Sequence, residues 1–298
     1  MAVEVRRVAD VRSIVAVLVG ATLLGSLGAW GRAVYRYESD PMTVVAWRAL
    51  IGAAALAAIL ALVRPALLKV NAKDLPFFLV YGFIGVTLNF WTYFSALKFT
   101  SLAIAVTLLF TFPAFVAVLS ALFLGERLTR TKLIAVGVTL LGSSLVVQLH
   151  HGDLVKLNLR GIVFGFLAAL CMATYSLLGK RAMVRYAPWT VVLYGFAAGG
   201  IFLALGSGPR MLAGASYPAA AWAWIVGLAL VPSLGGYALY NLGLGALPAS
   251  QVAVIATWEV VTAAALGWLL FGESLAPTQF LGAALVCYGI WRVQRPPA

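Results

Sequence analysis

The chain repeats itself at a constant offset of 147 residues, about half of its 298-residue length. The segment Pro41–Val45 (PMTVV) returns as Pro188–Val192 (PWTVV), and Leu124–Leu128 (LGERL) returns as Phe271–Leu275 (FGESL). The register holds without a gap between these blocks, which is typical of a duplicated unit, and the period is too long for a solenoid repeat. We therefore divide the chain into two copies, residues 1–150 and 151–298.

The composition places both copies in a membrane. Hydrophobic residues make up 63% of the chain and charged residues only 10%, whereas soluble domains run near 45–50% and about 25%. Apolar runs of about twenty residues, the length that a bilayer requires, follow one another along the whole sequence. The prediction is an all-α membrane protein of ten transmembrane helices, five per copy, with spans near residues 13–35, 42–63, 76–97, 101–123, 131–149, 160–180, 188–206, 220–243, 248–270 and 277–293.

The distribution of positive charge predicts the orientation. Of the 21 lysines and arginines, we assign fourteen to the side of the N-terminus and six to the opposite side, with Arg48 inside a span. By the positive-inside rule both termini face the cytoplasm of a cell (inner) membrane. The second copy then starts after an odd number of helices and is inverted relative to the first. Inverted membrane repeats are typical of transporters with a site between the halves.

Several other classes of function are disfavoured. The net charge of +12 is explained by the orientation, so no nucleic-acid partner is expected. Cys171 and Cys287 lie inside spans as packing residues, and their spacing suggests neither a disulfide framework nor a metal site. The pair His150-His151 is interpreted as a solvated loop, and no cofactor is expected. The chain has no Walker A lysine motif for an ATP-driven pump.

Two prolines are interpreted as hinge candidates, and two acids at equivalent positions of the copies are interpreted as structural. Pro113 in the fourth helix and Pro232 in the eighth each remove an intrahelical hydrogen bond and are hinge candidates, with a static kink as the alternative. Glu126 and Glu273 occupy equivalent positions after a helix-ending glycine, and we expect them on opposite membrane faces. An acid there suits the positive end of the next helix.

These features resemble the EamA-type members of the drug/metabolite transporter superfamily. The resemblance rests on the helix-two pattern from Pro41 to Arg48 and on the stretches 112–128 and 258–275. It spans nearly the whole chain and implies a pathway of ten helices within one chain, hence a monomer. The resemblance does not specify a substrate, because the superfamily transports amino acids, drugs and other metabolites.

Two charged residues mark the expected level of the binding site. Glu259 is the only acid that we place deep inside a span, and its position in the first copy is occupied by Phe112. A carboxylate there is costly unless it faces a cavity or a partner. We interpret Glu259 as a coupling group for protons or a counter-ion for a cationic substrate, with a structural role as the alternative. Arg48 is the only deep basic residue, and a packing or snorkelling role is favoured over binding a carboxylate.

Polar and aromatic side chains gather on particular helical faces. In the eighth helix Ser233, Tyr237, Tyr240 and Asn241 share one stripe. Whether such stripes line a cavity or join helices is left open. The predicted substrate-binding residues are Trp30, Tyr81, Asn89, Tyr93, Tyr175, Ser233, Tyr237, Tyr240, Asn241, Gln251, Trp258 and Glu259.

The expected function is secondary active transport by alternating access. An aromatic and amide-lined cavity with one carboxylate suits a small amphipathic solute, an amino acid or amine-bearing metabolite, which the protein is expected to export. The expected partners are this solute, the lipid bilayer and, as a hypothesis, protons. Alternatives are an importer of an organic cation such as a quaternary amine, a membrane-embedded enzyme acting on lipid, and a passive structural subunit. The isolated acids and thiols disfavour an enzyme.

Overall fold

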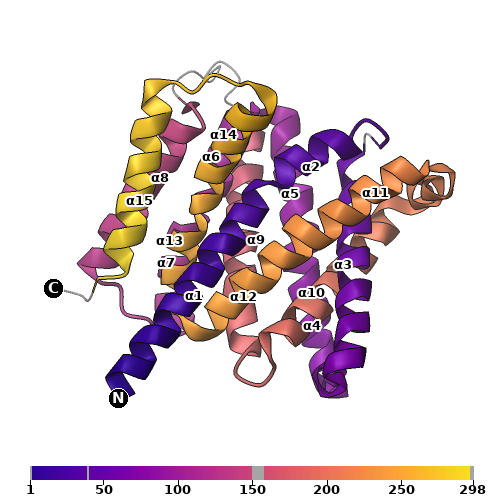
Figure 1. Ribbon diagram of the computed structural model, residues 1–298, viewed down its shortest axis with the longest axis horizontal. Helices are drawn as coiled ribbons and strands as arrows, with labels where there is room; N and C mark the ends of the chain where they lie inside the picture. Colours follow the sequence, from indigo (N-terminus) through magenta and orange to yellow (C-terminus); the bar gives the residue numbers. More distant parts are fainter. Residues whose placement is uncertain (1, 39, 150–157, 296–298) are drawn as a thin grey trace.

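The computed structural model describes residues 2–38, 40–149 and 158–295, which form a bundle of helices without a strand in these ranges (Figure 1). The predicted loop pair His150-His151 lies outside the described residues. The helices are α1 (Ala2–Gly25), α2 (Leu27–Val34), α3 (Pro41–Val63), α4 (Leu75–Gly82), α5 (Asn89–Phe99), α6 (Leu102–Leu109), α7 (Phe112–Phe123), α8 (Arg130–Val146), α9 (Leu159–Ala182), α10 (Pro188–Ser207), α11 (Ala219–Leu228), α12 (Gly236–Ala246), α13 (Ala249–Ala256), α14 (Trp258–Phe271) and α15 (Pro277–Val293).

Eight helical stretches among the described residues are long and apolar enough to cross a membrane. The predicted fifth and tenth spans are the helices α8 and α15, of 17 residues each. At 1.5 Å per residue they reach about 26 Å, a little less than the ~30 Å hydrocarbon core. The protein is thus an all-helical, multi-pass membrane protein with eight full-length candidate spans, and the count of ten remains a prediction.

Helices α8 and α15 pack closely against each other (Figure 1). A Cβ atom on Gly142 would lie 2.7 Å from the carbonyl oxygen of Gly282, and one on Gly282 would lie 2.6 Å from that of Gly142. Only glycine permits this approach, and small residues at helix crossings are the usual basis of association in lipid.

The predicted third and eighth spans each change to π-helical geometry part of the way along. The π segments are Phe83–Leu88, between α4 and α5, and Ala229–Gly235, between α11 and α12. Pro232 lies inside the second segment, and the hydroxyl of Ser233 donates to the carbonyl of Leu228 at 2.8 Å. The first segment forms without proline, so proline is not the common cause of the change. Such π segments occur frequently at functional sites.

The predicted fourth and ninth spans are each two half-helices rather than one helix. The first breaks at Phe110 and Thr111, between α6 and α7, and the second at Thr257, between α13 and α14. Pro113 lies in the first turn of α7, where no intrahelical donor is needed. The expectation that Pro113 removes a hydrogen bond from the interior of a helix is therefore wrong, and the break lies just before it.

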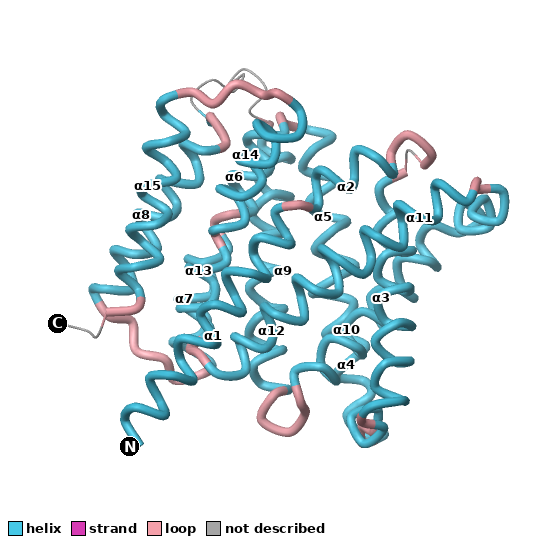
Figure 2. Tube along the Cα trace, viewed as in Figure 1, coloured by secondary structure: helices cyan, strands magenta, loops and turns pink. Residues whose placement is uncertain are grey.

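The motifs that carry Glu126 and Glu273 have the same turn. Gly125 and Gly272 have φ of 69° and 67°, the left-handed conformation that glycine adopts without a steric penalty. The amide of Glu126 donates to Ser120 and that of Glu273 to Gly267, as in a Schellman motif. Figure 2 shows the loop after α7 at the lower end of the bundle and the loop after α14 at the upper end.

The helix boundaries repeat with the register of the sequence. Each bound of α5, α6 and α8 lies 147 residues before the corresponding bound of α12, α13 and α15. The contacts between elements are similar in the two halves: α1 packs on α12 as α9 packs on α5, and α1 packs on α14 as α9 packs on α7. The boundary between copies near residue 150 remains a prediction that these bounds support.

Candidate functional site

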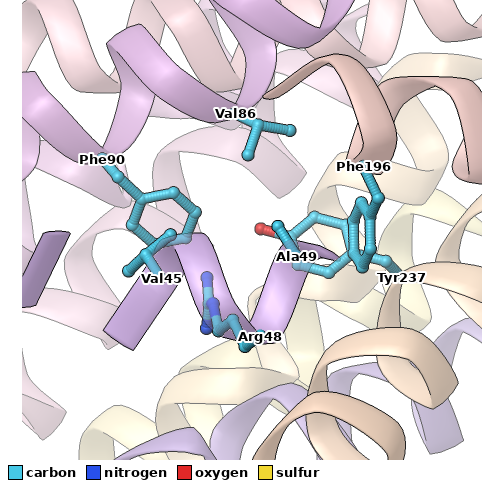
Figure 3. A pocket seen from close by; sticks show the side chains of 7 residues that line it. All are labelled: Val45, Arg48, Ala49, Val86, Phe90, Phe196 and Tyr237. Atoms are coloured by element: carbon cyan, nitrogen blue, oxygen red, sulfur yellow. The ribbon is translucent and has the colours of Figure 1, made fainter. Parts of the chain in front are cut away.

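A small cavity lies between helices of both sequence copies (Figure 3). In this conformation it has room for about one water molecule. The lining residues come from α3, the first π segment, α5, α10 and α12, and they are Val45, Arg48, Ala49, Val86, Phe90, Phe196 and Tyr237.

The lining reflects the sequence repeat. Phe90 and Tyr237 are 147 residues apart, as are Ala49 and Phe196, so two pairs of equivalent positions face the same space. Arg48 breaks this equivalence, because the matching position in the second copy is Gly195. The cavity therefore has similar aromatic walls from the two copies and a charge from only one of them.

The start of α3 determines where Arg48 lies. Asp40 caps the helix by accepting from the amide of Thr43 at 3.0 Å, and Pro41 occupies its first turn. Arg48 is seven residues farther on, about 10 Å along the helix axis. It shares one helical face with Val45 and Ala49. The guanidinium carbon lies 4.3 Å from the centroid of the Phe90 ring, and 7% of the residue is exposed.

Glu259 lies in the first turn of α14, next to the break at Thr257. Its prediction as the middle residue of a continuous span missed this break. At the start of a half-helix the carboxylate is favoured by the positive end of the helix dipole. Glu259 is partly exposed. It is close enough to Arg48, Tyr93 and Tyr237 to interact with these side chains electrostatically. Discontinuous helices whose ends face the substrate are a common feature of transporter sites.

Four of the predicted substrate-binding residues form a buried network between α4, α9 and α12. Asn241 donates to the hydroxyl of Tyr175 at 2.7 Å and to the carbonyl of Tyr237 at 2.8 Å. The ring of Tyr175 stacks on Tyr81 with centroids 4.9 Å apart, and the hydroxyl of Tyr240 bonds Ser176 at 2.7 Å. Tyr81, Tyr175, Tyr240 and Asn241 are at most 1% exposed. Their side chains join helices in this structure, and of the predicted set only Tyr237 lines the cavity.

The remaining predicted residues are spread over the bundle. Asn89 joins α5 to α9 by donating to the carbonyl of Ala168 at 2.8 Å. Trp30 packs edge-on against Trp224 of α11, away from the cavity lining. The indole nitrogen of Trp258 donates to Thr22 at 3.1 Å. Ser233 completes the π segment as described above. Tyr93 and Gln251 are partly exposed and do not line the cavity.

Sequence reasoning missed most of the lining. The sequence favours a packing role for Arg48, and it does not distinguish the apolar lining residues, because apolar residues are common on every face of such helices. These residues are Val45, Ala49, Val86, Phe90 and Phe196. The available signal was the repeat itself: the polar position Tyr237 identifies Phe90 as its equivalent, 147 residues earlier.

The two ends of the bundle differ at the equivalent acids. Glu126 accepts from the amide of Ala249 at 2.5 Å, from the amide of Ser250 at 3.4 Å and from the hydroxyl of Ser250, at the N-terminus of α13. Lys132 pairs with it at 3.0 Å. Glu273 is not bonded to the N-terminus of α6 among the described residues. It pairs with Arg32 at 2.5 Å instead.

Burial at the two half-helix starts follows the same difference. Ala249 at the start of α13 is fully buried, whereas its equivalent Leu102 at the start of α6 is 63% exposed. The hydrogen bonds of Glu126 therefore join the loop after α7 to the start of α13 at one end. At the other end, the structure describes no such bond between Glu273 and the start of α6. This reading refines the expectation that both acids are structural.

Known proteins with similar sequences are transporters. The chain is 28% identical over 93% of its length to an uncharacterized transporter of Archaeoglobus fulgidus, covering 95% of that protein. It is 30% identical to a probable terminal-alkyne amino-acid exporter of Streptantibioticus cattleyicolor, covering 76% of this chain and 75% of that one. It is 29% identical to the threonine/homoserine exporter of Escherichia coli K12, covering 68% and 67%.

The fold is also known. A crystal structure with 19% sequence identity aligns over 97% of this chain and 98% of its own with a TM-score of 0.77, which shows a shared fold. The profile of the EamA-like transporter family matches the chain twice, at residues 11–148 and 159–293. Together these two stretches cover nearly the whole sequence, so the resemblance seen in the helix-two and Gly-Glu motifs is confirmed. The protein is a member of the EamA-like transporter family.

Proposed function

We propose that this protein is a secondary transporter that exports small amphipathic solutes, amino acids or amine-bearing metabolites, by alternating access. The observation that carries the proposal is the cavity between the copies, to which equivalent residues of both contribute: Phe90 with Tyr237 and Ala49 with Phe196. A site on the axis between two inverted repeats can be exposed to either side when one half rocks against the other. Of the relatives named above, one is named as a probable amino-acid exporter and another as a threonine/homoserine exporter.

The difference between the two ends supports alternating access. The end at which Glu126 caps α13 is tied, whereas Glu273 at the other end pairs with Arg32. Exchange of these roles between the two acids would open one end as the other closes. In this proposal the second copy is inverted relative to the first, both termini are cytoplasmic, and a single chain contains the complete pathway.

Glu259 is the proposed proton-coupling residue. It is the acid nearest to the half-helix break at Thr257, and its charge acts on the cavity residues Arg48 and Tyr237. Protonation would change the charge at the site without moving the backbone. An intramembrane acid of this kind is a functional candidate because its burial would otherwise be costly.

Flux into proteoliposomes tests the proposal. Purified protein should show saturable counterflow of at least one radiolabelled amino acid, and an imposed pH gradient should accelerate net flux. Glu259→Gln should retain counterflow but lose the acceleration, whereas Asp74→Asn, which removes an acid paired with Arg185 outside the cavity, should keep it. Equal acceleration in wild type and Glu259→Gln would eliminate proton coupling through this residue. Absence of saturable counterflow for amino acids and amines alike would refute the transport proposal.

An organic cation is a less suitable solute than a zwitterion. The guanidinium of Arg48 lies in the cavity wall, and its charge repels a quaternary amine, which has no carboxylate to offset the repulsion.

The direction of transport is proposed from the exporter relatives alone, and counterflow measured with either orientation of the gradient tests it.

A further inference from the structure

Arg48 is a buried cation that forms no ion pair with an acid in the described part of the chain. Among the described residues no hydrogen bond or ion pair reaches its guanidinium, although only 7% of the residue is exposed. Glu259 acts on it through space but does not form an ion pair with it. A basic side chain in the membrane interior normally pairs or faces a cavity, and Figure 3 shows Arg48 directed into the cavity.

The guanidinium of Arg48 packs against an aromatic ring. The ring of Phe90 covers one face, with the guanidinium carbon 4.3 Å from the ring centroid. With this face occupied, the donors at the edge of the planar group remain for a ligand, and their fork matches the two oxygens of a carboxylate. Neither aromatic stacking nor the partly apolar wall satisfies these donors.

The rest of the lining selects among anions. Val45, Ala49, Val86 and Phe196 are apolar, and Tyr237 supplies the one other polar group of the wall. A phosphate needs more donors than one arginine and one hydroxyl provide, because three oxygens share its charge. A single carboxylate on a small, partly apolar body is satisfied by this arrangement.

We propose that Arg48 binds the carboxylate of the transported solute and thereby selects carboxylate-bearing solutes over neutral or cationic ones. The proposal rests on the transport function proposed above and specifies its solute class. Because the equivalent position is Gly195, the pseudo-symmetric cavity has one anion-binding side, which orients the solute. Arg48 is then a specificity-determining residue rather than the packing residue that its sequence context suggested.

The test compares two chemically matched probes in two protein variants. Competition with radiolabelled counterflow gives apparent affinities for L-threonine and for L-threonine methyl ester, which lacks the free carboxylate. Arg48→Gln should weaken threonine binding by about 10- to 100-fold, the value of one hydrogen bond to a charged group. The ester should compete poorly with wild type and should change little in the variant. Arg48→Lys should recover part of the threonine affinity, because it keeps the charge but not the fork.

Control measurements separate folding from binding. Arg36→Gln removes an exposed arginine outside the cavity and should behave as wild type. Size-exclusion profiles and thermal unfolding in detergent should show that Arg48→Gln is folded. Unchanged threonine affinity in Arg48→Gln, or equal losses for threonine and its ester, would overturn the carboxylate proposal.

The failure of this proposal differs from the failure of the proposed function. If wild type transports a solute without a carboxylate, such as choline, and Arg48→Gln transports it equally well, the function stands and the role of Arg48 is wrong. If wild type shows no saturable counterflow with any probe, the transport proposal itself fails.

Discussion

Replacement of Glu126 by glutamine should open the end of the bundle that this residue ties. The carboxylate accepts from the amide of Ala249 and from Ser250 at the start of α13, and it pairs with Lys132 at 3.0 Å. The glutamate side chain is 13% exposed, so solvent screens these interactions only in part.

The expected magnitude follows from the bonds that change. Hydrogen bonds to a charged group are worth about 1.5–3 kcal/mol and neutral ones about 0.5–1.5 kcal/mol. Two good bonds that lose the charge therefore weaken by ~2–3 kcal/mol in total, and loss of the interaction with the helix end adds ~0.3–1 kcal/mol. A total of ~2–4 kcal/mol corresponds to a shift of the closed-to-open equilibrium by about 30- to 900-fold.

Distances between spin labels measure this equilibrium. Exposed Arg127 and Pro248 flank the hydrogen bonds of Glu126, and their equivalents Ser274 and Ser101 flank the opposite end. The pair Arg127→Cys with Pro248→Cys should report a short distance in wild type and a longer one in Glu126→Gln. Glu273→Gln serves as the matched control and should leave that distance unchanged. An unchanged distribution in Glu126→Gln, or the same lengthening in Glu273→Gln, would refute the assignment.

The tie should also depend on pH. Burial acts to raise the pKa of Glu126, but donation by Ser250, Lys132 and the amide of Ala249 lowers it overall below the ordinary 4.5. The positive charge of Lys180 also interacts with this carboxylate and, like that of Lys132, favours its ionised form. A lowered pKa means that the stabilisation is complete above about 4.5 and is lost as pH falls through the lowered value. Acidification through this lowered pKa should therefore lengthen the distance in wild type and have no such effect in Glu126→Gln.

Three further substitutions test the interpretation of the bundle. Tyr175→Phe removes the hydroxyl that accepts the hydrogen bond from Asn241. It should lower the free energy of unfolding by ~0.6–1.7 kcal/mol and leave solute affinity within about threefold of wild type. A large loss of affinity at unchanged stability would instead place Tyr175 in the binding site. Lys180→Met removes the hydrogen bonds that the ammonium group donates to the carbonyls of Leu244 and Leu247, at 2.6 and 2.7 Å. It should lower the free energy of unfolding by ~2–4 kcal/mol. Gly195→Leu places a Cβ atom 2.6 Å from the ring of Tyr81 and should lower the yield of folded protein, because overpacking typically costs ~1–3 kcal/mol.

Much of the fold was predictable because a membrane imposes length and hydropathy on each helix. The bounds of α3, α10 and α15 start within a residue of the predicted spans. The breaks at Phe110 and Thr257 were not predictable in the same way, because apolar residues continue across them. Likewise, α8 and α15 have 17 residues each and are shorter than the eight full-length candidate spans. Their packing through Gly142 and Gly282 is a tertiary contact that the local sequence does not specify.

The binding site was less accessible to sequence reasoning for a physical reason. A polar residue on one face of a membrane helix must be satisfied, but either a cavity or a neighbouring helix can satisfy it. The side-chain amide nitrogens of Asn241 and Asn89 donate to neighbouring helices, whereas Arg48 has Phe90 on one face and the cavity before it. Sequence periodicity shows which residues share a face and does not distinguish these cases.

Site-specific labelling in intact cells tests most directly the claim that two oppositely oriented copies enclose the cavity. Cys171 and Cys287 are first replaced, and single cysteines are placed at the equivalent exposed positions Arg127 and Ser274. A membrane-impermeant maleimide should label Ser274→Cys in intact cells and Arg127→Cys only after permeabilisation. Labelling of both positions from the same side of the membrane would contradict the inverted arrangement and, with it, the alternating-access site between the copies.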